Sequence, residues 1–167
     1  HEILLKPENL QVTGSFKIRG AYNKIASLSE EQIARGIVTA SAGNHAQGVA
    51  YAARERHAKA TICMPQITPP LKVDATKAYG ADVVLYGDVF DEAAAHAAEL
   101  ASTQGMIYVP PFDDYEVICG QGTIGLEILE DVPNVTDVVV PLGGGGLGAG
   151  VALAINCLLY TSPSPRD

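Results

Sequence analysis

The chain has 167 residues, of which 47% are hydrophobic and 18% are charged, a composition typical of a globular protein with a buried core. Its formal net charge of -8, with 11 lysines and arginines spread along the chain, excludes a broad basic surface for nucleic acid or anionic lipid. A bound phosphate must therefore be held by local backbone groups, which directs attention to glycine-rich loops.

The three cysteines, Cys63, Cys119 and Cys157, lie far apart, without a CxxC pair or a cluster with histidine. This spacing indicates neither a disulfide framework nor a zinc site, so we predict no metal centre. No stretch approaches the length of an apolar membrane span, and charge and proline interrupt the first residues, HEILLKPENL, which argues against a signal peptide. We therefore expect a cytoplasmic protein without membrane or nucleic-acid partners.

Helical and strand patterns alternate along the chain. Amphipathic periodicity predicts helices, and short β-branched runs predict strands. The expected helices cover residues 15–28, 45–57, 71–79, 91–104 and 120–130, with a further helical turn after Ser29. The expected strands cover residues 36–40, 60–64, 81–86, 106–110 and 136–142.

This order predicts an α/β fold in which parallel sheets carry helices on both faces, because each crossover helix must return over the sheet. Ligands of such sheets gather at the carboxyl ends of the strands. Residues 110–114, with two prolines and two aspartates, are expected to cross between two lobes. Residues 156–167 do not fit the pattern, since their prolines and serines cannot continue a helix, and we interpret them as a non-native tail. A flexible terminus is the alternative.

Three segments could carry chemistry, and the first is SAGNHAQG, residues 41–48. A strand that passes at once into a helix leaves several backbone N–H groups unpaired, which can receive a carboxylate or phosphate. Asn44 adds a side chain with both a donor and an acceptor. The alternative is a simple helix cap by Ser41 or Asn44.

The second segment is GGGGLGAG, residues 143–150, which follows the predicted strand TDVVVPL. Four consecutive glycines allow backbone amides to approach a bulky anion without a Cβ in the way, and phosphate is the natural ligand. The segment also satisfies the G-x-G-x-x-G pattern through Gly143, Gly145 and Gly148, so a dinucleotide-binding turn is an alternative, as is a plain flexible loop.

The third segment is TGSFKIRGAYNK, residues 13–24. Lys17 and Arg19 lie two apart on a predicted helix and so point to different faces, while Phe16 and Ile18 flank Lys17 with apolar bulk. Burial lowers the pKa of an amine, which favours nucleophilic or Schiff-base chemistry. The alternative is a surface lysine whose stem lies along apolar neighbours.

Taken together, SFKIRGA, SAGNHAQG and GGGGLGAG, with VPPFDD and GQGTIGLEIL between the last two, resemble threonine dehydratases and their serine dehydratase and serine racemase relatives. The resemblance covers His1 to about Ile155 and implies the fold type II architecture of pyridoxal-phosphate (PLP) enzymes, with a smaller α/β lobe inserted into a larger one. The smaller lobe would be residues 39–116. The larger lobe would comprise residues 1–38 and 117–155, and would be truncated here.

The same resemblance implies residue roles. Lys17 would hold PLP as a Schiff base and then act as the base at the substrate Cα, with Phe16 packed beside the ring and Asn44 bonded to the ring hydroxyl. The cofactor phosphate would be bound by the backbone amides of Gly143, Gly144, Gly145, Gly146 and Leu147. The substrate carboxylate would be bound by the turn that comprises Ser41, Ala42, Gly43, Asn44 and His45.

The implied reaction removes water from L-threonine or L-serine and then forms a 2-oxo acid and ammonia, in a homo-oligomeric enzyme. Ala42 stands where serine racemases place a second serine and has no exchangeable proton, which disfavours racemization. Other fold type II elimination or replacement enzymes and an inactive fragment remain as alternatives. A nicotinamide-dependent enzyme would need an acidic residue roughly 20 positions after its glycines, and only Asp167 is available.

Overall fold

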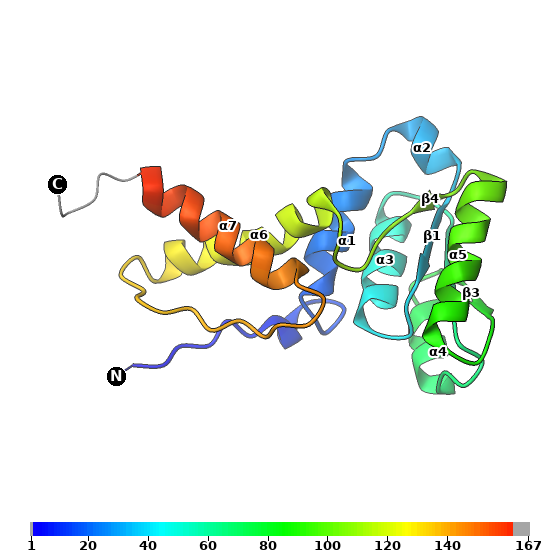
Figure 1. Ribbon diagram of the computed structural model, residues 1–167, viewed down its shortest axis with the longest axis horizontal. Coiled ribbons are helices and arrows are strands. Elements are labelled where there is room, and N and C mark those ends of the chain that lie inside the picture. Colours follow the sequence, from blue (N-terminus) through cyan, green and yellow to red (C-terminus); the bar gives the residue numbers. More distant parts are fainter. Residues whose placement is uncertain (1, 162–167) are drawn as a thin grey trace.

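The computed structural model describes the backbone of residues 2–161 and the side chains of residues 2–158. Helices and strands alternate along most of this range (Figure 1). The helices are the short 3-10 helix η1 (Glu8–Leu10), α1 (Lys17–Ala26), α2 (Glu30–Ala34), α3 (Asn44–Glu55), α4 (Pro70–Lys77), α5 (Phe90–Gln104), α6 (Tyr115–Asp131) and α7 (Gly146–Thr161). The strands are β1 (Ile37–Ala40), β2 (Ala60–Met64), β3 (Asp82–Leu85) and β4 (Ile107–Tyr108).

The four strands form one parallel sheet in the order β3-β2-β1-β4. In the register of this sheet, Ile37 of β1 lies opposite Ala60 of β2 on one side and Ile107 of β4 on the other. Helix α3 covers one face of the sheet and α5 covers the other (Figure 1). The predicted α/β fold, with a parallel sheet between helices, is therefore confirmed, and four of the five predicted strands form.

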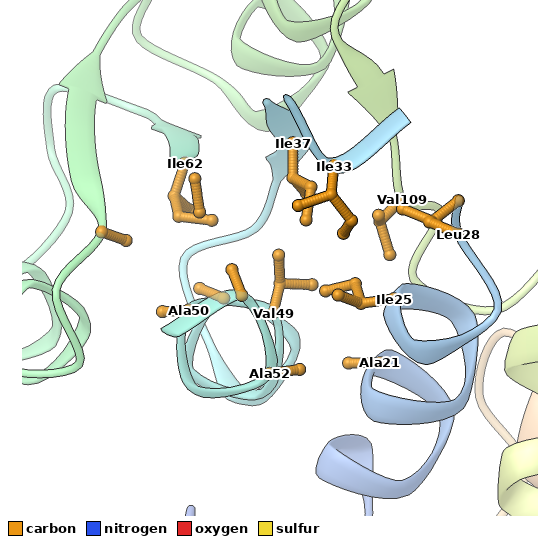
Figure 2. Packing of buried hydrophobic residues seen from close by; sticks show 14 of the residues in the cluster. Ala21, Ile25, Leu28, Ile33, Ile37, Val49, Ala50, Ala52, Ile62 and Val109 are labelled. Carbon is orange, nitrogen blue, oxygen red and sulfur yellow. The ribbon is translucent and has the colours of Figure 1, made fainter. Parts of the chain in front are cut away.

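Strand β1 is buried along its whole length because its alternating side chains face two separate cores. Ile37 belongs to the core under α3, whereas Val38 and Ala40 belong to the core under α5. Figure 2 shows Ile37, Val49 and Ile25 pointing toward one another from β1, α3 and α1. Helix α1 is thus fixed to the sheet through the same apolar core as α3.

Helix α1 lies between α3 and α6, and α6 packs along α7 (Figure 1). Glycines permit the close contacts. A Cβ added at Gly48 of α3 would lie 3.1 Å from the carbonyl carbon of Lys17, and one added at Gly122 of α6 would lie 3.0 Å from the carbonyl oxygen of Gly150. A larger residue at position 48 would push away the end of α1 that carries Lys17.

Two predictions about the second half of the chain are wrong. The helix expected from Gly120 already begins at Tyr115, because the Asp114 carboxylate caps it by accepting a hydrogen bond of 3.1 Å from Val117 N. Residues 136–142 do not form the expected strand, and Val139 is 95% exposed. A parallel strand needs a neighbour for its hydrogen bonds, and none of the four described strands pairs with this segment.

Helix α7 extends into the segment that was interpreted as a tail. It runs through Thr161, into residues 156–167 that the sequence assigned to a tail, while the two prolines of that segment lie outside the described residues. The non-native origin of the tail stays a prediction. Within residues 2–161, no helix combines the length and apolar character needed to cross a bilayer.

Candidate functional site

The three segments singled out in the sequence lie at the starts of three helices. Lys17 is the first residue of α1, Asn44 the first of α3, and Gly146 the first of α7. The first N–H groups of a helix have no partner within the helix and carry partial positive charge, so such ends favour anions. Residues 109–112, which follow β4, connect the three helix starts through contacts of their main chain and of Phe112.

The Lys17 side chain is half-buried, which favours the first of the two interpretations of this residue. Its Nζ donates a hydrogen bond of 2.5 Å to the Pro111 carbonyl and lies 5.5 Å from the centre of the Phe16 ring. Burial lowers the pKa of the Lys17 amine below its ordinary value, because the charged form loses hydration. A larger fraction of this amine is therefore neutral, and a neutral amine can act as a nucleophile or a base.

Arg19 points to the other face of α1, as predicted from its spacing. Its guanidinium donates to Glu8 of η1 and to Glu127 of α6, and it also bonds the hydroxyl of Thr123 at 2.9 Å. The Arg19 guanidinium is thus paired with two carboxylates, on the face of α1 that points away from Lys17. Lys17, by contrast, contacts residues 109–112 through its hydrogen bond to the Pro111 carbonyl.

The turn from Ser41 to His45 leaves α3 without a side-chain cap. Gly43 is the N-cap residue, and the Ser41 hydroxyl instead accepts a hydrogen bond of 3.2 Å from Gly43 N. The interpretation of this segment as a simple cap by Ser41 or Asn44 is therefore wrong. Asn44 is exposed and Ala42 is half-buried, so the turn can meet a ligand while the helix start supplies backbone donors.

His45 is buried, with 3% of its surface exposed. Its Nε2 lies 3.1 Å from the Val109 carbonyl oxygen. The pKa of His45 is lowered to about 4, mainly because burial disfavours the charged form; the Val109 hydrogen bond opposes this shift and the nearby Lys17 charge adds to it. The imidazole is therefore neutral at pH 7.

The glycine loop packs against Phe112. A Cβ added at Gly146 would lie 2.9 Å from the Phe112 carbonyl oxygen, and one at Gly144 would overlap the Phe112 ring. Gly145 has a φ of +88°, a conformation that side-chain-bearing residues rarely adopt, and no atom outside its neighbours lies within 4 Å of a Cβ added there or at Gly143. The loop thus has one packed side and one open side, and Leu147 follows in the first turn of α7.

Val109 was expected at the end of a strand and residues 110–112 in a crossover, and the role of this segment in the site was missed. The carbonyls of Val109 and Pro111 accept hydrogen bonds from His45 and Lys17, and Phe112 supports the glycine loop. Backbone carbonyls are common to all residues, so a single sequence carries no signal for such a role. The aromatic residue after two prolines was the one visible sign.

The chain is similar in sequence to known proteins. Residues 1–165 match the family described as “Pyridoxal-phosphate dependent enzyme”. The chain is 59% identical over 157 residues to the L-threonine ammonia-lyase of Thermotoga maritima. The aligned residues make up 94% of this chain and 39% of that protein. It is 52% identical over 157 residues to the catabolic L-threonine dehydratase TdcB of Escherichia coli K12. This alignment includes 94% of this chain and 48% of that protein.

The similarity extends to solved structures. The processed form of threonine deaminase isoform 2 from Solanum lycopersicum matches with a TM-score of 0.91 at 52% identity, over 94% of this chain and 43% of that chain. Maize serine racemase matches with a TM-score of 0.87 at 40% identity, over 90% of this chain and 46% of that chain. The chain therefore spans less than half the length of each of these relatives.

Proposed function

The chain belongs to the family of pyridoxal-phosphate dependent enzymes, and on this premise we propose that it is the lysine-bearing part of an ammonia-lyase that acts on L-threonine. The placement of the Lys17 amine carries this proposal, because it is half-buried, has a lowered pKa and lies at a helix start. The names of the curated relatives favour L-threonine over L-serine as the substrate. Family membership favours the cofactor phosphate over a dinucleotide as the group bound at the glycine loop.

The described residues fit the cofactor of this family. Lys17 supplies an amine that can bond to the aldehyde, with Phe16 beside it. The open side of the glycine loop and the start of α7 supply backbone donors for the phosphate from Gly143 to Leu147. The exposed side chain of Asn44 is available to bond the ring hydroxyl.

The residues of this chain also fit the elimination reaction. When bound, the cofactor provides an electron-withdrawing ring that takes up the electron pair left at the substrate Cα. Lys17 would remove the Cα proton, since its lowered pKa favours the neutral, proton-accepting form. The uncapped start of α3 would hold the substrate carboxylate on the turn from Ser41 to His45. Loss of the β-hydroxyl with a proton, as water, leaves an unsaturated amino acid that hydrolyses to a 2-oxo acid and ammonia.

Ala42 supports ammonia-lyase chemistry over racemization. It lies half-buried in the turn that would face the substrate, and its methyl group has no proton to donate to the opposite face of Cα. Racemization needs a second proton carrier there. Elimination needs no proton carrier on that face, because Lys17 removes the Cα proton from the other side.

We further propose two lobes, with residues 39–116 as the smaller and residues 1–38 and 117–155 as parts of the larger. The position of the sheet beside α3 and α5, with α6 and α7 on the far side of α1, supports this division (Figure 1). A cytoplasmic, homo-oligomeric enzyme completes the proposal. The free thiols of Cys63 and Cys119 agree with a reducing compartment.

Covalent labelling tests the assignment of Lys17. The chain is incubated with PLP, reduced with borohydride and digested, and the labelled lysines are identified by mass spectrometry. We expect Lys17 to be labelled at PLP concentrations that leave exposed Lys72 and Lys77 unmodified. Lys17→Ala should abolish this selective labelling.

Lys24→Ala is the matched control, because Lys24 lies on the same helix but is held by an ion pair of 2.7 Å with Asp114. It should leave labelling at Lys17 unchanged. Labelling spread evenly over all lysines, or surviving in Lys17→Ala, would show that the cofactor lysine is wrongly assigned.

A further inference from the structure

The buried imidazole of His45 has one nitrogen bonded and one without a partner. Its Nε2 lies 3.1 Å from the Val109 carbonyl oxygen, while Nδ1 has no hydrogen-bond partner among the described residues. A buried acceptor without a partner destabilises a fold, and most buried polar atoms avoid this state. An apolar residue of similar size would suit this position better if packing were its only task.

The Val109 carbonyl fixes the tautomer of His45. It accepts a hydrogen bond of 2.7 Å from the Thr39 hydroxyl in addition to the contact with His45. Because a carbonyl oxygen can only accept, the proton of the neutral imidazole must lie on Nε2. The two donors use both lone pairs of this oxygen, so residue 109 is held from β1 and from α3 at once.

Residues 109–112 carry this restraint to the rest of the site. Two residues after Val109, the Pro111 carbonyl accepts the hydrogen bond from Lys17 Nζ. The next residue, Phe112, lies against Gly144 and Gly146. Pro110 and Pro111 have fixed φ angles, so this short segment transmits a displacement instead of absorbing it.

We propose that His45 is a positioning residue whose imidazole, through the Val109 carbonyl, holds residues 109–112 in place and thereby sets the positions of Lys17 and the glycine loop. The turn for the substrate carboxylate is thus coupled to the lysine and to the loop for the phosphate. This role rests on the proposed function, since it concerns the same site.

The test compares PLP labelling at Lys17 in variants of the 167-residue chain. His45→Leu removes the donor to Val109 and should raise the PLP concentration for half-maximal labelling at Lys17 by about tenfold. His45→Gln should recover most of the loss, because its amide can donate at the distance reached by Nε2. Thermal melting is measured for each variant in parallel.

Thr76→Val is the matched structural control. Thr76 is 1% exposed and donates a hydrogen bond of 3.0 Å to the Lys72 carbonyl in α4, without contact with residues 109–112. It should lower the melting temperature and leave labelling at Lys17 unchanged. If His45→Leu does not fold, Thr39→Val removes the other donor to Val109 and should weaken labelling several-fold.

Each outcome of these measurements supports or overturns a proposal. Equal labelling in His45→Leu and the unmodified chain overturns the role of His45, as does a loss in His45→Gln as large as in His45→Leu. Equal labelling in Thr39→Val overturns it where His45→Leu does not fold. Absence of selective labelling at Lys17 in the unmodified chain is a different result: it rejects the proposed function, and the role of His45 with it.

Discussion

Arg19 donates two hydrogen bonds to the carboxylate of Glu127, with N–O distances of 2.5 and 2.8 Å, across the contact between α1 and α6. It donates two more to Glu8, at 2.8 and 2.9 Å, and Lys6 adds an ion pair of 2.9 Å with Glu127. These bonds tie the helix that carries Lys17 to α6 and to the residues before it. They stabilise the position of α1 without occupying the site.

Glu127→Gln should lower the free energy of unfolding by about 1 kcal/mol at pH 7, a modest value because the carboxylate is partly exposed. The Arg19 guanidinium lowers the pKa of Glu127 to about 2, from an ordinary value of 4.5. As the pH falls, Glu127 is therefore protonated in the unfolded chain before it is protonated in the folded chain. The stabilisation by the Glu127 charge is complete above pH 4.5 and is lost as the pH falls toward 2.

Urea unfolding at pH 7, 4 and 3 measures this difference between Glu127→Gln and the unmodified chain. The difference in the free energy of unfolding between the two proteins should become smaller as the pH falls. Glu55→Gln, which breaks only the surface pair with Arg54, is the control and should cost less at pH 7. A gap that stays constant down to pH 3 would contradict the role of the Glu127 charge.

His45 should make the protein sensitive to mild acid. Its folded pKa of about 4 lies below the ordinary value of 6.5, so the unfolded chain takes up the proton first as the pH falls. The stability linked to neutral His45 is complete above pH 6.5 and decreases down to pH 4, by on the order of 3 kcal/mol. Urea unfolding of the unmodified chain and His45→Gln at pH 7, 5.5 and 4.5 checks this, and parallel stability curves would refute it.

Gly146→Ala should destabilise the chain by about 1 to 3 kcal/mol, because the new methyl group would lie 2.9 Å from the Phe112 carbonyl oxygen. Gly148→Ala is its control two residues further along α7, where the nearest atom would be 3.4 Å away. This change should be neutral or stabilising by about 0.5 to 1 kcal/mol through helix propensity. Thermal melting distinguishes the two, and equal effects would show that the loop does not pack on Phe112 as described.

The Lys17 amine should react at lower pH than an exposed lysine. Burial lowers its pKa, so its neutral form persists further into the acid range, although burial also slows access of the reagent. Trace labelling with acetic anhydride from pH 7 to 11, read by mass spectrometry, compares the pH of half-maximal rate for Lys17 with that for Lys72. Coinciding profiles would contradict the lowered pKa.

The isolated chain should associate at micromolar concentration. Ile3, Leu5, Val139 and Leu142 are each more than 80% exposed, and residues 136–142 form neither a helix nor a strand. Light scattering during a thermal ramp tests this, with Val139→Thr combined with Leu142→Ser expected to reduce association. A sharp melting transition of the unmodified chain without aggregation would count against it.

The elements that sequence reasoning predicted well are those whose signals are local. The helical turn after Ser29 is capped by the Ser29 hydroxyl and the Gln32 side chain, both within four residues of one another. The alternation from β1 to α5 likewise depends on periodicity inside each element. Residues 136–142 have the same β-branched pattern, yet pairing requires a neighbour that the pattern cannot supply.

The site was predictable only in part for the same reason. Lys17, Asn44 and the glycines could be singled out because their residue types have distinctive chemistry. The carbonyls of Val109 and Pro111 could not, since every residue has one. Asp114 did carry a local signal, since aspartate is a favoured residue at the N-cap of a helix and here accepts a hydrogen bond from Val117 N. The two prolines nearby nevertheless led to the prediction of a crossover at this position.

The contacts that complete the site join distant parts of the chain: Lys17 and Pro111 are 94 positions apart, and Arg19 and Glu127 are 108 apart. During synthesis at roughly 5 to 20 residues per second, about 5 to 20 seconds pass between the appearance of Lys17 and that of its carbonyl partner. Throughout that interval the Lys17 amine lacks this hydrogen-bond partner. The complete set of contacts around Lys17 therefore forms only after residues 109–112 have been made.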